Sequence, residues 1–125
     1  MAQLVKMTGK EKPGIMTINL QDNIPVFAAI NINIEDTADG YKWDSLVLPE
    51  YALINIYNAD NSLKYKIFTT HIIKAYYDDN DAAAILANYL SDQTNIKYKK
   101  EFDEYQAIRT IAKTVANNIV STRLF

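Results

Sequence analysis

The sequence contains no cysteine among its 125 residues. Disulfide bonds, thiolate nucleophiles and cysteine-ligated zinc sites are therefore excluded, and the fold must rest on an apolar core and on backbone hydrogen bonds. Glycine is also scarce, with three residues. Because phosphate-binding loops need glycine where the backbone approaches the ligand closely, this scarcity argues against a nucleotide-binding loop.

Long apolar runs and a strong net charge are missing as well. No apolar run approaches the roughly 20 residues that a membrane-spanning helix needs. The first fourteen residues lack the continuous apolar stretch of a signal peptide, so we expect synthesis in the cytoplasm and no membrane partner. The formal net charge is −2, whereas a nucleic-acid-binding protein needs a basic surface, so nucleic acid is an unlikely partner by this criterion.

The composition that is present is typical of one globular domain. Hydrophobic residues make up 49% of the chain and charged residues 22%, which is sufficient for a single apolar core. The polar start of the chain, with Gly9, Pro13 and Gly14, predicts a polar arm over residues 1–14, followed by a single domain over residues 15–125. Tyrosine occurs nine times, and its large ring with a polar tip suits both strands and protein-contact surfaces.

Period-two alternation predicts several strands in the N-terminal half. The clearest is residues 26–36, where the isoleucines occupy one face and the asparagines the other: Ile30, Ile32 and Ile34 against Asn31 and Asn33. Weaker patterns predict further strands over residues 15–20, 41–48 and, less cleanly, 51–58. Composition predicts turns at 21–25 and 36–40.

Spacing of three and four residues predicts helices in the C-terminal half. The strongest covers residues 97–121, and its apolar stripe consists of Phe102, Tyr105, Ile108, Ala112, Val115 and Ile119. Such a stripe either packs on the domain's own sheet or forms the seam of a helical oligomer. A shorter helix is predicted over residues 81–90, and residues 91–95 break it.

Residues 62–77 fit two patterns, and the sequence leaves both open. Apolar residues at helical spacing predict a helix, for which Ser62 is a candidate N-cap. The alternation of lysine with tyrosine and isoleucine fits instead the return strand of a hairpin with residues 51–58. With either assignment the expected fold class is α+β, in which a small antiparallel sheet from the N-terminal half packs against two or three helices from the C-terminal half.

Two clusters of carboxylates resemble cation sites at first sight. The aspartates of residues 78–81 are followed by AAAILANYL, which lacks the alternating oxygen ligands, the central glycine and the late glutamate of a calcium loop. Aspartate is, however, a favoured helix cap. The carboxylates of residues 35–44 also fail the calcium spacing and surround an Asp-Gly pair that is typical of hairpins. We interpret the clusters as a cap and a turn, and expect no metal or other cofactor.

Catalytic motifs are not recognisable in the chain. The lone histidine, His71, cannot build a typical zinc site. Its apolar surroundings indicate a core or rim residue whose polar ring atoms have hydrogen-bond partners. The basic stretch KYKK at 97–100 is followed by acids, which indicates a solvated helical turn and not a nucleic-acid site. We therefore predict no enzymatic activity and no small-molecule substrate.

Charge is spread unevenly along the chain. Residues 35–92 carry ten acidic and four basic side chains, whereas residues 93–125 carry six basic and three acidic ones. These regions attract each other within one chain or between neighbouring copies, or they are solvated faces that do not interact.

Three stretches carry a family resemblance: DGYKWDSLVLPE (39–50), IIKAYYDDNDAAAILANYL (72–90) and KKEFDEYQAIRTIAK (99–113). Together they cover 46 of the 125 residues and resemble small phage and prophage virion- or tail-module proteins of gut bacteria. Residues 51–66 depart from the family's pattern. The resemblance implies a non-enzymatic virion structural accessory of a capsid, tail or fibre, made in the host cytoplasm. Its partners would be other virion proteins and copies of itself.

Aromatic and arginine side chains dominate the energetics of many protein interfaces. On this basis we predict six candidate partner contacts: Tyr41, Trp43, Tyr98, Phe102, Tyr105 and Arg109. Trp43 also fits a place in the core. Competing functions are a tail or fibre assembly chaperone, a cellular adaptor domain and a small enzyme whose carboxylates converge in a pocket.

Overall fold

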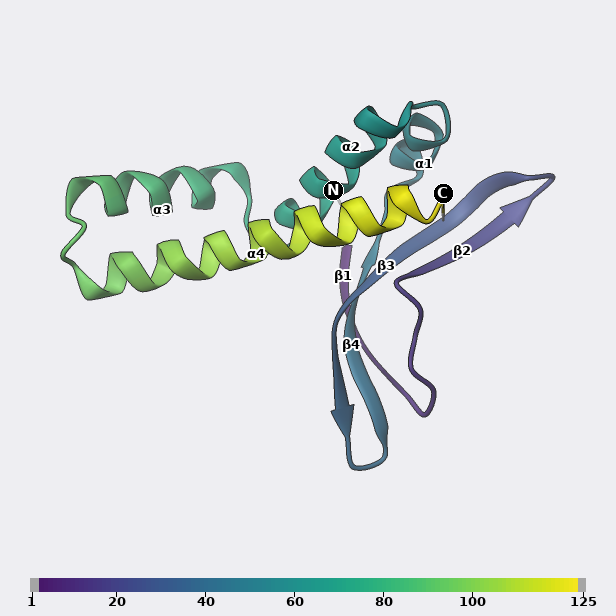
Figure 1. Cartoon of the computed structure of the whole chain (residues 1–125), viewed down its shortest axis with the longest axis horizontal. Coiled ribbons are helices and arrows are strands. Elements are labelled where there is room, and N and C mark those ends of the chain that lie inside the picture. Colours follow the sequence, from purple (N-terminus) through teal and green to yellow (C-terminus); the bar gives the residue numbers. More distant parts are fainter. Residues whose placement is uncertain (1–2, 124–125) are drawn as a thin grey trace.

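The computed structural model describes residues 3–123, in which four strands precede four helices. The strands are β1 (Gln3–Gly9), β2 (Met16–Gln21), β3 (Ile24–Thr37) and β4 (Gly40–Val47). The helices are α1 (Glu50–Tyr57), α2 (Asn61–Tyr76), α3 (Asp79–Ser91) and α4 (Ile96–Ser121). The α+β fold class is confirmed, because an antiparallel sheet from the N-terminal half packs against helices from the C-terminal half (Figure 1).

The sheet has the order β1-β4-β3-β2, and every neighbouring pair is antiparallel. The long strand β3 pairs with β2 through its first half and with β4 through its second half. The β2–β3 and β3–β4 hairpins consequently extend in different directions from the centre of the molecule (Figure 1). The predicted strands over 15–20, 26–36 and 41–48 are confirmed.

The turn between β2 and β3 lies where composition predicts it. Gln21 pairs with Ile24, so the loop consists of Asp22 and Asn23 alone. Their φ angles are 53° and 65°. Positive φ at both central residues is required by the tight hairpin turn whose twist matches that of the strands, and Asp and Asn tolerate this conformation better than most residues.

A β-bulge interrupts the alternation of β3 at Asn33. Ile32 pairs with Asp44, but the next paired residue is Glu35, opposite Lys42. The extra residue is accommodated by Asn33, whose φ of 55° lies in the left-handed region. The bulge turns the Asn33 side chain toward Asp44, to which it donates a hydrogen bond. The predicted sharing of one face by Asn31 and Asn33 is therefore wrong.

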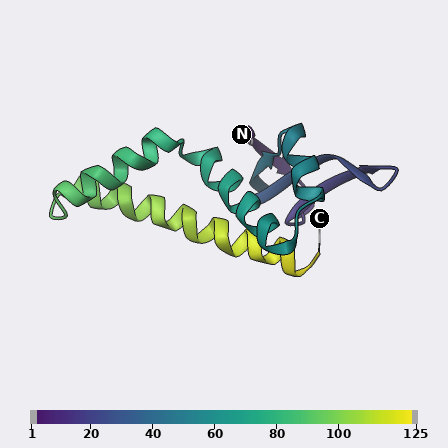
Figure 2. The same ribbon diagram turned by 90° about the horizontal axis from the view of Figure 1, so that it is seen from above.

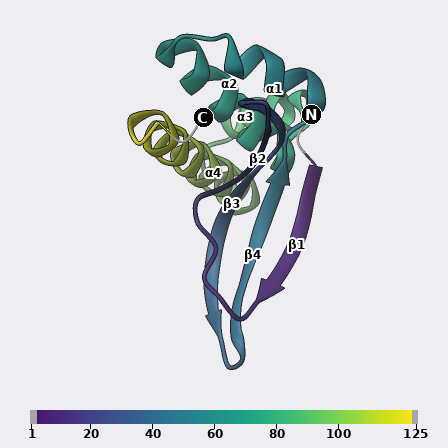
Figure 3. The same cartoon turned by 90° about the vertical axis from the view of Figure 1, so that its right-hand side faces the viewer.

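The core lies between the central strands and three helices. Its largest fully buried side chains come from β3, β4, α1, α2 and α4: Ile30, Leu46, Ile56, Phe68, Ile72 and Ile119. Burying each such side chain contributes roughly 1.5–3 kcal/mol. The helices gather over one end of the sheet, and the β3–β4 hairpin extends beyond them (Figure 3).

Residues 51–58 form helix α1, so the prediction of a third strand there is wrong. Leu53 and Ile56 lie one and four positions after Ala52, which places these three buried residues on one face of a helix. Pro49 is the N-cap, where the missing N–H of proline leaves no helical hydrogen bond unmade. The competing assignments for 62–77 are resolved in favour of a helix, α2.

The predicted polar arm over residues 1–14 is wrong for residues 3–9, which form strand β1; residues 1 and 2 lie outside the described part of the chain. β1 pairs with β4 over its whole length, from Gln3 opposite Val47 to Gly9 opposite Tyr41. An edge strand contributes few side chains to a core, so its composition resembles that of a loop.

Helices α3 and α4 confirm the predictions over 81–90 and 97–121. Asp78 caps α3, because its Oδ1 accepts a 2.7 Å hydrogen bond from the backbone N–H of Asp81. The C-terminal half of α4 joins the core through Ala112, Ala116 and Ile119. Its N-terminal half leaves the body of the domain and runs beside α3 as a helical hairpin (Figures 1 and 2).

The N-cap of α2 is Asp60 and not the predicted Ser62, and this difference can be tested. The Oδ1 of Asp60 accepts a 2.8 Å hydrogen bond from the Leu63 N–H. Asp60→Ala should lower the free energy of unfolding by about 1 kcal/mol, because an N–H at the helix start loses its partner. Ser62→Ala is the matched control and should change it by less than about 0.5 kcal/mol. Urea denaturation measures both, and equal losses would contradict the assignment.

Candidate functional site

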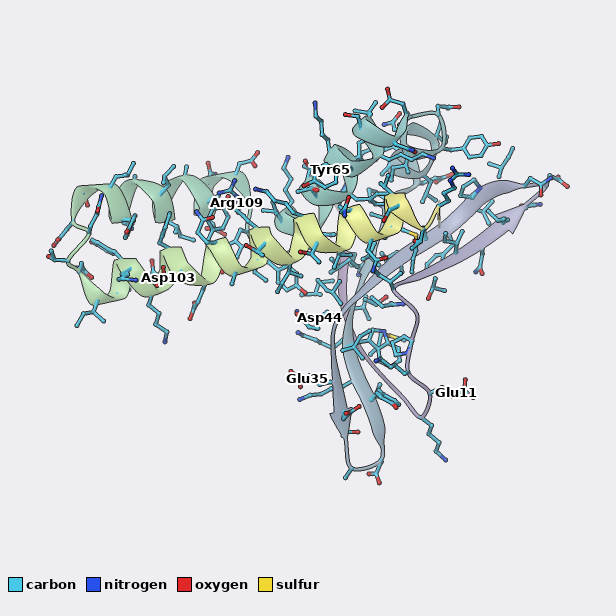
Figure 4. All side chains as sticks on the ribbon, viewed as in Figure 1. Glu11, Glu35, Asp44, Tyr65, Asp103 and Arg109 are labelled. Carbon is cyan, nitrogen blue, oxygen red and sulfur yellow. The ribbon has the colours of Figure 1, made fainter. Side chains whose placement is uncertain are left out.

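Asp44, on β4, is a buried carboxylate with 6% of its surface exposed. Its Oδ1 accepts a 2.6 Å hydrogen bond from Lys6 Nζ, with which it forms an ion pair. Its Oδ2 accepts two hydrogen bonds, from Tyr76 Oη at 2.7 Å and from Asn33 Nδ2 at 2.9 Å. We call these four residues the Asp44 junction. It joins β1, β3, β4 and α2, and Figure 4 shows Asp44 where the sheet meets the helices.

Local structure explains how each donor reaches the carboxylate. Lys6 is directly opposite Asp44 in the β1–β4 register, so both side chains lie on one face of the sheet. Asn33 reaches it through the bulge, and Tyr76 is the last residue of α2. Asn33 Nδ2 also lies 3.1 Å from Tyr76 Oη. The junction therefore fixes the end of α2 against the sheet.

The electrostatics of the junction favour an ionised carboxylate. Burial by itself raises the pKa of Asp44, but the hydrogen bonds from Lys6, Tyr76 and Asn33 outweigh burial and hold the pKa below its ordinary value of 3.8. Burial, followed by the hydrogen bond to the carboxylate, raises the pKa of the Tyr76 hydroxyl. Tyr76 therefore stays protonated and donates its hydrogen bond to a carboxylate that is ionised at neutral pH. Because both carboxylate oxygens are occupied, this arrangement serves structure better than proton transfer.

A groove of about 620 Å³ lies beside the junction, and strands β1, β3 and β4 line it. Trp43 and Met7 contribute apolar surface, and Met7 is 40% exposed. At the same groove, Glu35 and Lys42 form an exposed ion pair with a nitrogen–oxygen distance of 3.1 Å. Apolar surface bordered by charges is the kind of lining found at protein contact sites.

The six predicted contact residues fall in two separate places. Tyr41 and Trp43 are on β4, and Trp43 lines the groove. The Trp43 ring also packs closely on Gly9, where an added Cβ would lie 3.1 Å from its Cη2 atom. The other four are on the N-terminal half of α4: Tyr98, Phe102, Tyr105 and Arg109. The structure therefore does not unite the six in one surface.

Two of the predicted residues on α4, Phe102 and Tyr105, contact side chains elsewhere in the chain. Phe102 stacks on Tyr89 of α3, with ring centroids 4.0 Å apart. Tyr105 meets Tyr77 edge to face at 5.1 Å, and Arg109 lies 5.9 Å from the centre of the Tyr105 ring. Figure 4 places Arg109 near the base of the helical hairpin. The Phe102 contact holds α3 to α4, and the Tyr105 contact holds the C-cap of α2 to α4. A role for the same side chains in binding a partner remains a prediction.

Exposed apolar residues outside this predicted set were missed by the sequence reasoning. On the β2–β3 hairpin, Leu20, Ile24 and Val26 are 60%, 50% and 51% exposed. The signal in the sequence was weak, because a register shift interrupts the period-two pattern of β3 between Pro25 and Phe27. On α1, the missed residues are Tyr51, Ile54 and Tyr57, which are 59%, 59% and 50% exposed. That signal was hidden because the segment was interpreted as a strand.

His71 lies within α2, and the prediction that its polar atoms are satisfied is wrong for one of them. Its Nδ1 is buried without a hydrogen-bond partner in the described structure. Burial, together with the positive charge of Lys74, lowers the pKa of His71.

Within residues 3–123 no three histidine or carboxylate side chains gather closely enough to hold a metal ion. In the same range, no helix combines the length and hydropathy needed to cross a membrane.

Comparison with protein-family models, curated proteins and solved structures finds no match to this chain.

The Asp44 junction predicts a pH-dependent contribution to stability. Asp44→Asn should lower the free energy of unfolding by about 2 kcal/mol at neutral pH, the scale of a charge-assisted hydrogen bond. Because the folded pKa lies below 3.8, this contribution is present above that pH and is lost as the pH falls through the folded value. The difference between variant and unsubstituted protein should therefore shrink in acid. Denaturant unfolding at several pH values measures it.

The control for this experiment is Glu35→Gln, which breaks the exposed ion pair with Lys42. Both partners are more than half exposed, at 58% for Lys42 and 62% for Glu35. Exposed pairs contribute about 0–1 kcal/mol, so this variant should behave almost like the unsubstituted protein. A loss as large for Glu35→Gln as for Asp44→Asn would contradict a special role for the junction.

Proposed function

We propose that this chain is a non-enzymatic structural accessory of a phage particle, a capsid, tail or fibre component that acts through protein–protein contacts. The resemblance of residues 39–50, 72–90 and 99–113 to phage and prophage proteins supports the phage setting. The exposed apolar surface on the β2–β3 hairpin supports action by contact. In this proposal the protein is made in the host cytoplasm and carried in the virion.

The observation that carries the proposal is the exposed apolar surface of the β2–β3 hairpin beyond the helices. A register shift after Asn19 makes Val26 a bulge residue, so Leu20 and Ile24 lie on opposite faces of the hairpin. Leu20, Ile24 and Val26 are 60%, 50% and 51% exposed, whereas Ala28 is fully buried. Apolar side chains that lie outside the chain's own core are what a partner's surface would cover.

The outward side of α1 offers a second apolar surface. Tyr51, Ile54 and Tyr57 recur at three-residue intervals, so they lie along one side of the helix. The opposite side, with Ala52, Leu53 and Ile56, is buried in the core. Tyrosine provides large contact area at a small cost in conformational entropy, which favours its use at interfaces. Two exposed apolar surfaces on a chain of 125 residues are consistent with a protein that joins others.

The direct test is mass spectrometry of purified phage particles, with the number of copies per particle. A structural accessory should be present in many copies and should stay with the particle through purification. Absence from particles, combined with a requirement during assembly, would replace this proposal with an assembly chaperone. Absence from particles with no effect on assembly would favour a cellular adaptor domain.

A double variant tests whether the β2–β3 hairpin makes the contact. Ile24→Thr with Val26→Thr keeps β-branched side chains, which suit a strand, but removes apolar surface. If each change weakens the contact by about 0.7 kcal/mol, incorporation into particles should fall about tenfold. Quantitative mass spectrometry of particles measures the fall.

The matched control is Asn19→Thr on the same hairpin. Asn19 is opposite Phe27 and exposed, and its polar side chain is not part of the apolar surface that the double variant removes. Incorporation should be unchanged for this control, and circular dichroism should show equal folding for all three proteins. Full incorporation of the double variant would remove the hairpin from the proposed contact surface.

A further inference from the structure

Helix α3 presents two different faces. Its face toward α4 carries the half-buried residues Ala82, Ile85 and Tyr89, the last of which stacks on Phe102. A second set lies outside that contact and is exposed; we call it the α3 stripe, and it consists of Ala83, Leu86, Ala87 and Leu90. Leu86 and Leu90 are 46% and 63% exposed, and α3 has no buried residue at all.

The spacing of the α3 stripe is that of a helix-packing seam. Its members are separated by three, one and three residues, which aligns them along one side of a helix. The helical hairpin of α3 and the first half of α4 stands away from the sheet and the other helices (Figures 1 and 2). The stripe is therefore accessible along the full length of α3, roughly 20 Å for 13 residues.

We propose that the α3 stripe is a homodimer interface, at which it packs antiparallel on the same stripe of a second copy of this chain. A twofold axis between positions 86 and 87 relates the two helices. Leu86 then lies opposite the partner's Ala87, and Leu90 lies opposite the partner's Ala83. Each leucine meets an alanine, so large and small side chains interdigitate. A parallel pair would place leucine on leucine and alanine on alanine, with crowding at one level and a void at the next.

Charge supports the same orientation. Asp79 lies one turn before Ala83 on the line of the stripe, and Asp78 caps the helix. The far end of the helical hairpin carries Lys97 and Lys100, whose side chains are 79% and 75% exposed. Antiparallel packing brings the aspartates of one copy near the lysines of the other, whereas parallel packing would place aspartate against aspartate.

The existing ion pairs of these groups leave them able to interact across the dimer. Lys74 and Asp79 are 3.7 Å apart, and Lys97 and Glu101 are 4.0 Å apart. Such long, exposed pairs contribute little and rearrange readily. The apolar stripe that the sequence predicted on α4 contacts α3 and the core, so within the helical hairpin it is α3 that leaves an exposed apolar face for a second copy. This inference rests on the proposed function, of which it names one partner.

Two substitutions at neighbouring alanines test the interface. Ala87→Gln inserts a long polar side chain where Leu86 of the second copy must fit, whereas Ala84→Gln changes an alanine that is also exposed but lies off the stripe. Sedimentation equilibrium over a range of concentrations should show a dimer for the unsubstituted protein and for Ala84→Gln. Ala87→Gln should weaken association at least tenfold. A monomer at every concentration for the unsubstituted protein, or equal effects of both variants, would overturn the proposal.

Cross-linking tests the orientation, because the chain has no cysteine of its own. In the antiparallel dimer the two copies of position 87 lie beside the axis, so Ala87→Cys should form an intermolecular disulfide on mild oxidation. The two copies of position 83 lie about 10 Å apart along the helices. A disulfide needs Cα atoms within about 7 Å, so Ala83→Cys should not cross-link efficiently. Efficient cross-linking of both variants would indicate a parallel pair. Failure of both variants to cross-link would exclude the α3 stripe as the dimer interface.

The outcomes separate this inference from the proposed function. A monomeric chain present in many copies per particle would overturn the dimer and leave the accessory role standing. A dimer that depends on Ala87, in a protein absent from particles, would support the interface and overturn the accessory role.

Discussion

The arrangement of strands and helices depends on the buried charge of Asp44. A carboxylate with 6% of its surface exposed is stable only where donors replace the water it has lost. Its donors come from three other elements, through Lys6, Tyr76 and Asn33. Each of these elements is thereby held at a defined position around β4. The apolar core supplies most of the stabilisation, but it is non-directional, and the Asp44 junction determines which residues meet.

The bulge in β3 follows from the same requirement. Strict alternation would direct Asn33 away from Asp44 and would leave Oδ2 with Tyr76 alone. One extra residue, with φ of 55° at Asn33, brings the amide to the carboxylate. Asparagine is one of the few residues that adopt this backbone conformation readily and also carry a donor. A local departure from regular strand geometry is in this way compensated by a hydrogen bond to a charged group.

A core confined to one end of the sheet leaves three elements projecting: the β2–β3 hairpin, the β3–β4 hairpin and the helical hairpin of α3 with α4 (Figures 1 and 3). The first and third carry apolar side chains that the chain itself does not cover, among them Ile24, Val26, Leu86 and Leu90. A small chain that keeps such residues at its extremities, at a cost in solubility, is better suited to contact than to catalysis within a cleft. This is the physical basis for proposing an accessory that works in contact with other proteins.

Much of the fold could be predicted from the sequence, because local patterns report local structure. Alternation identified β2, β3 and β4, spacing of three and four identified α3 and α4, and Asp78 was correctly interpreted as a cap. Segments whose structure depends on distant partners were not predictable in this way. Strand β1 exists because β4 offers it a pairing edge, and α1 is helical because its Ala52, Leu53 and Ile56 fit the core on one face.

The sequence by itself determined the fold class, the helices α3 and α4 and the absence of cysteine chemistry, since composition and periodicity act residue by residue. Only the tertiary structure decided that Lys6, Asn33, Asp44 and Tyr76 converge, because a bulge and a sheet register bring together positions up to 70 residues apart. It also decided which apolar faces are covered and which are left exposed. Burial is a property of the packed assembly of elements, and no single segment carries that information.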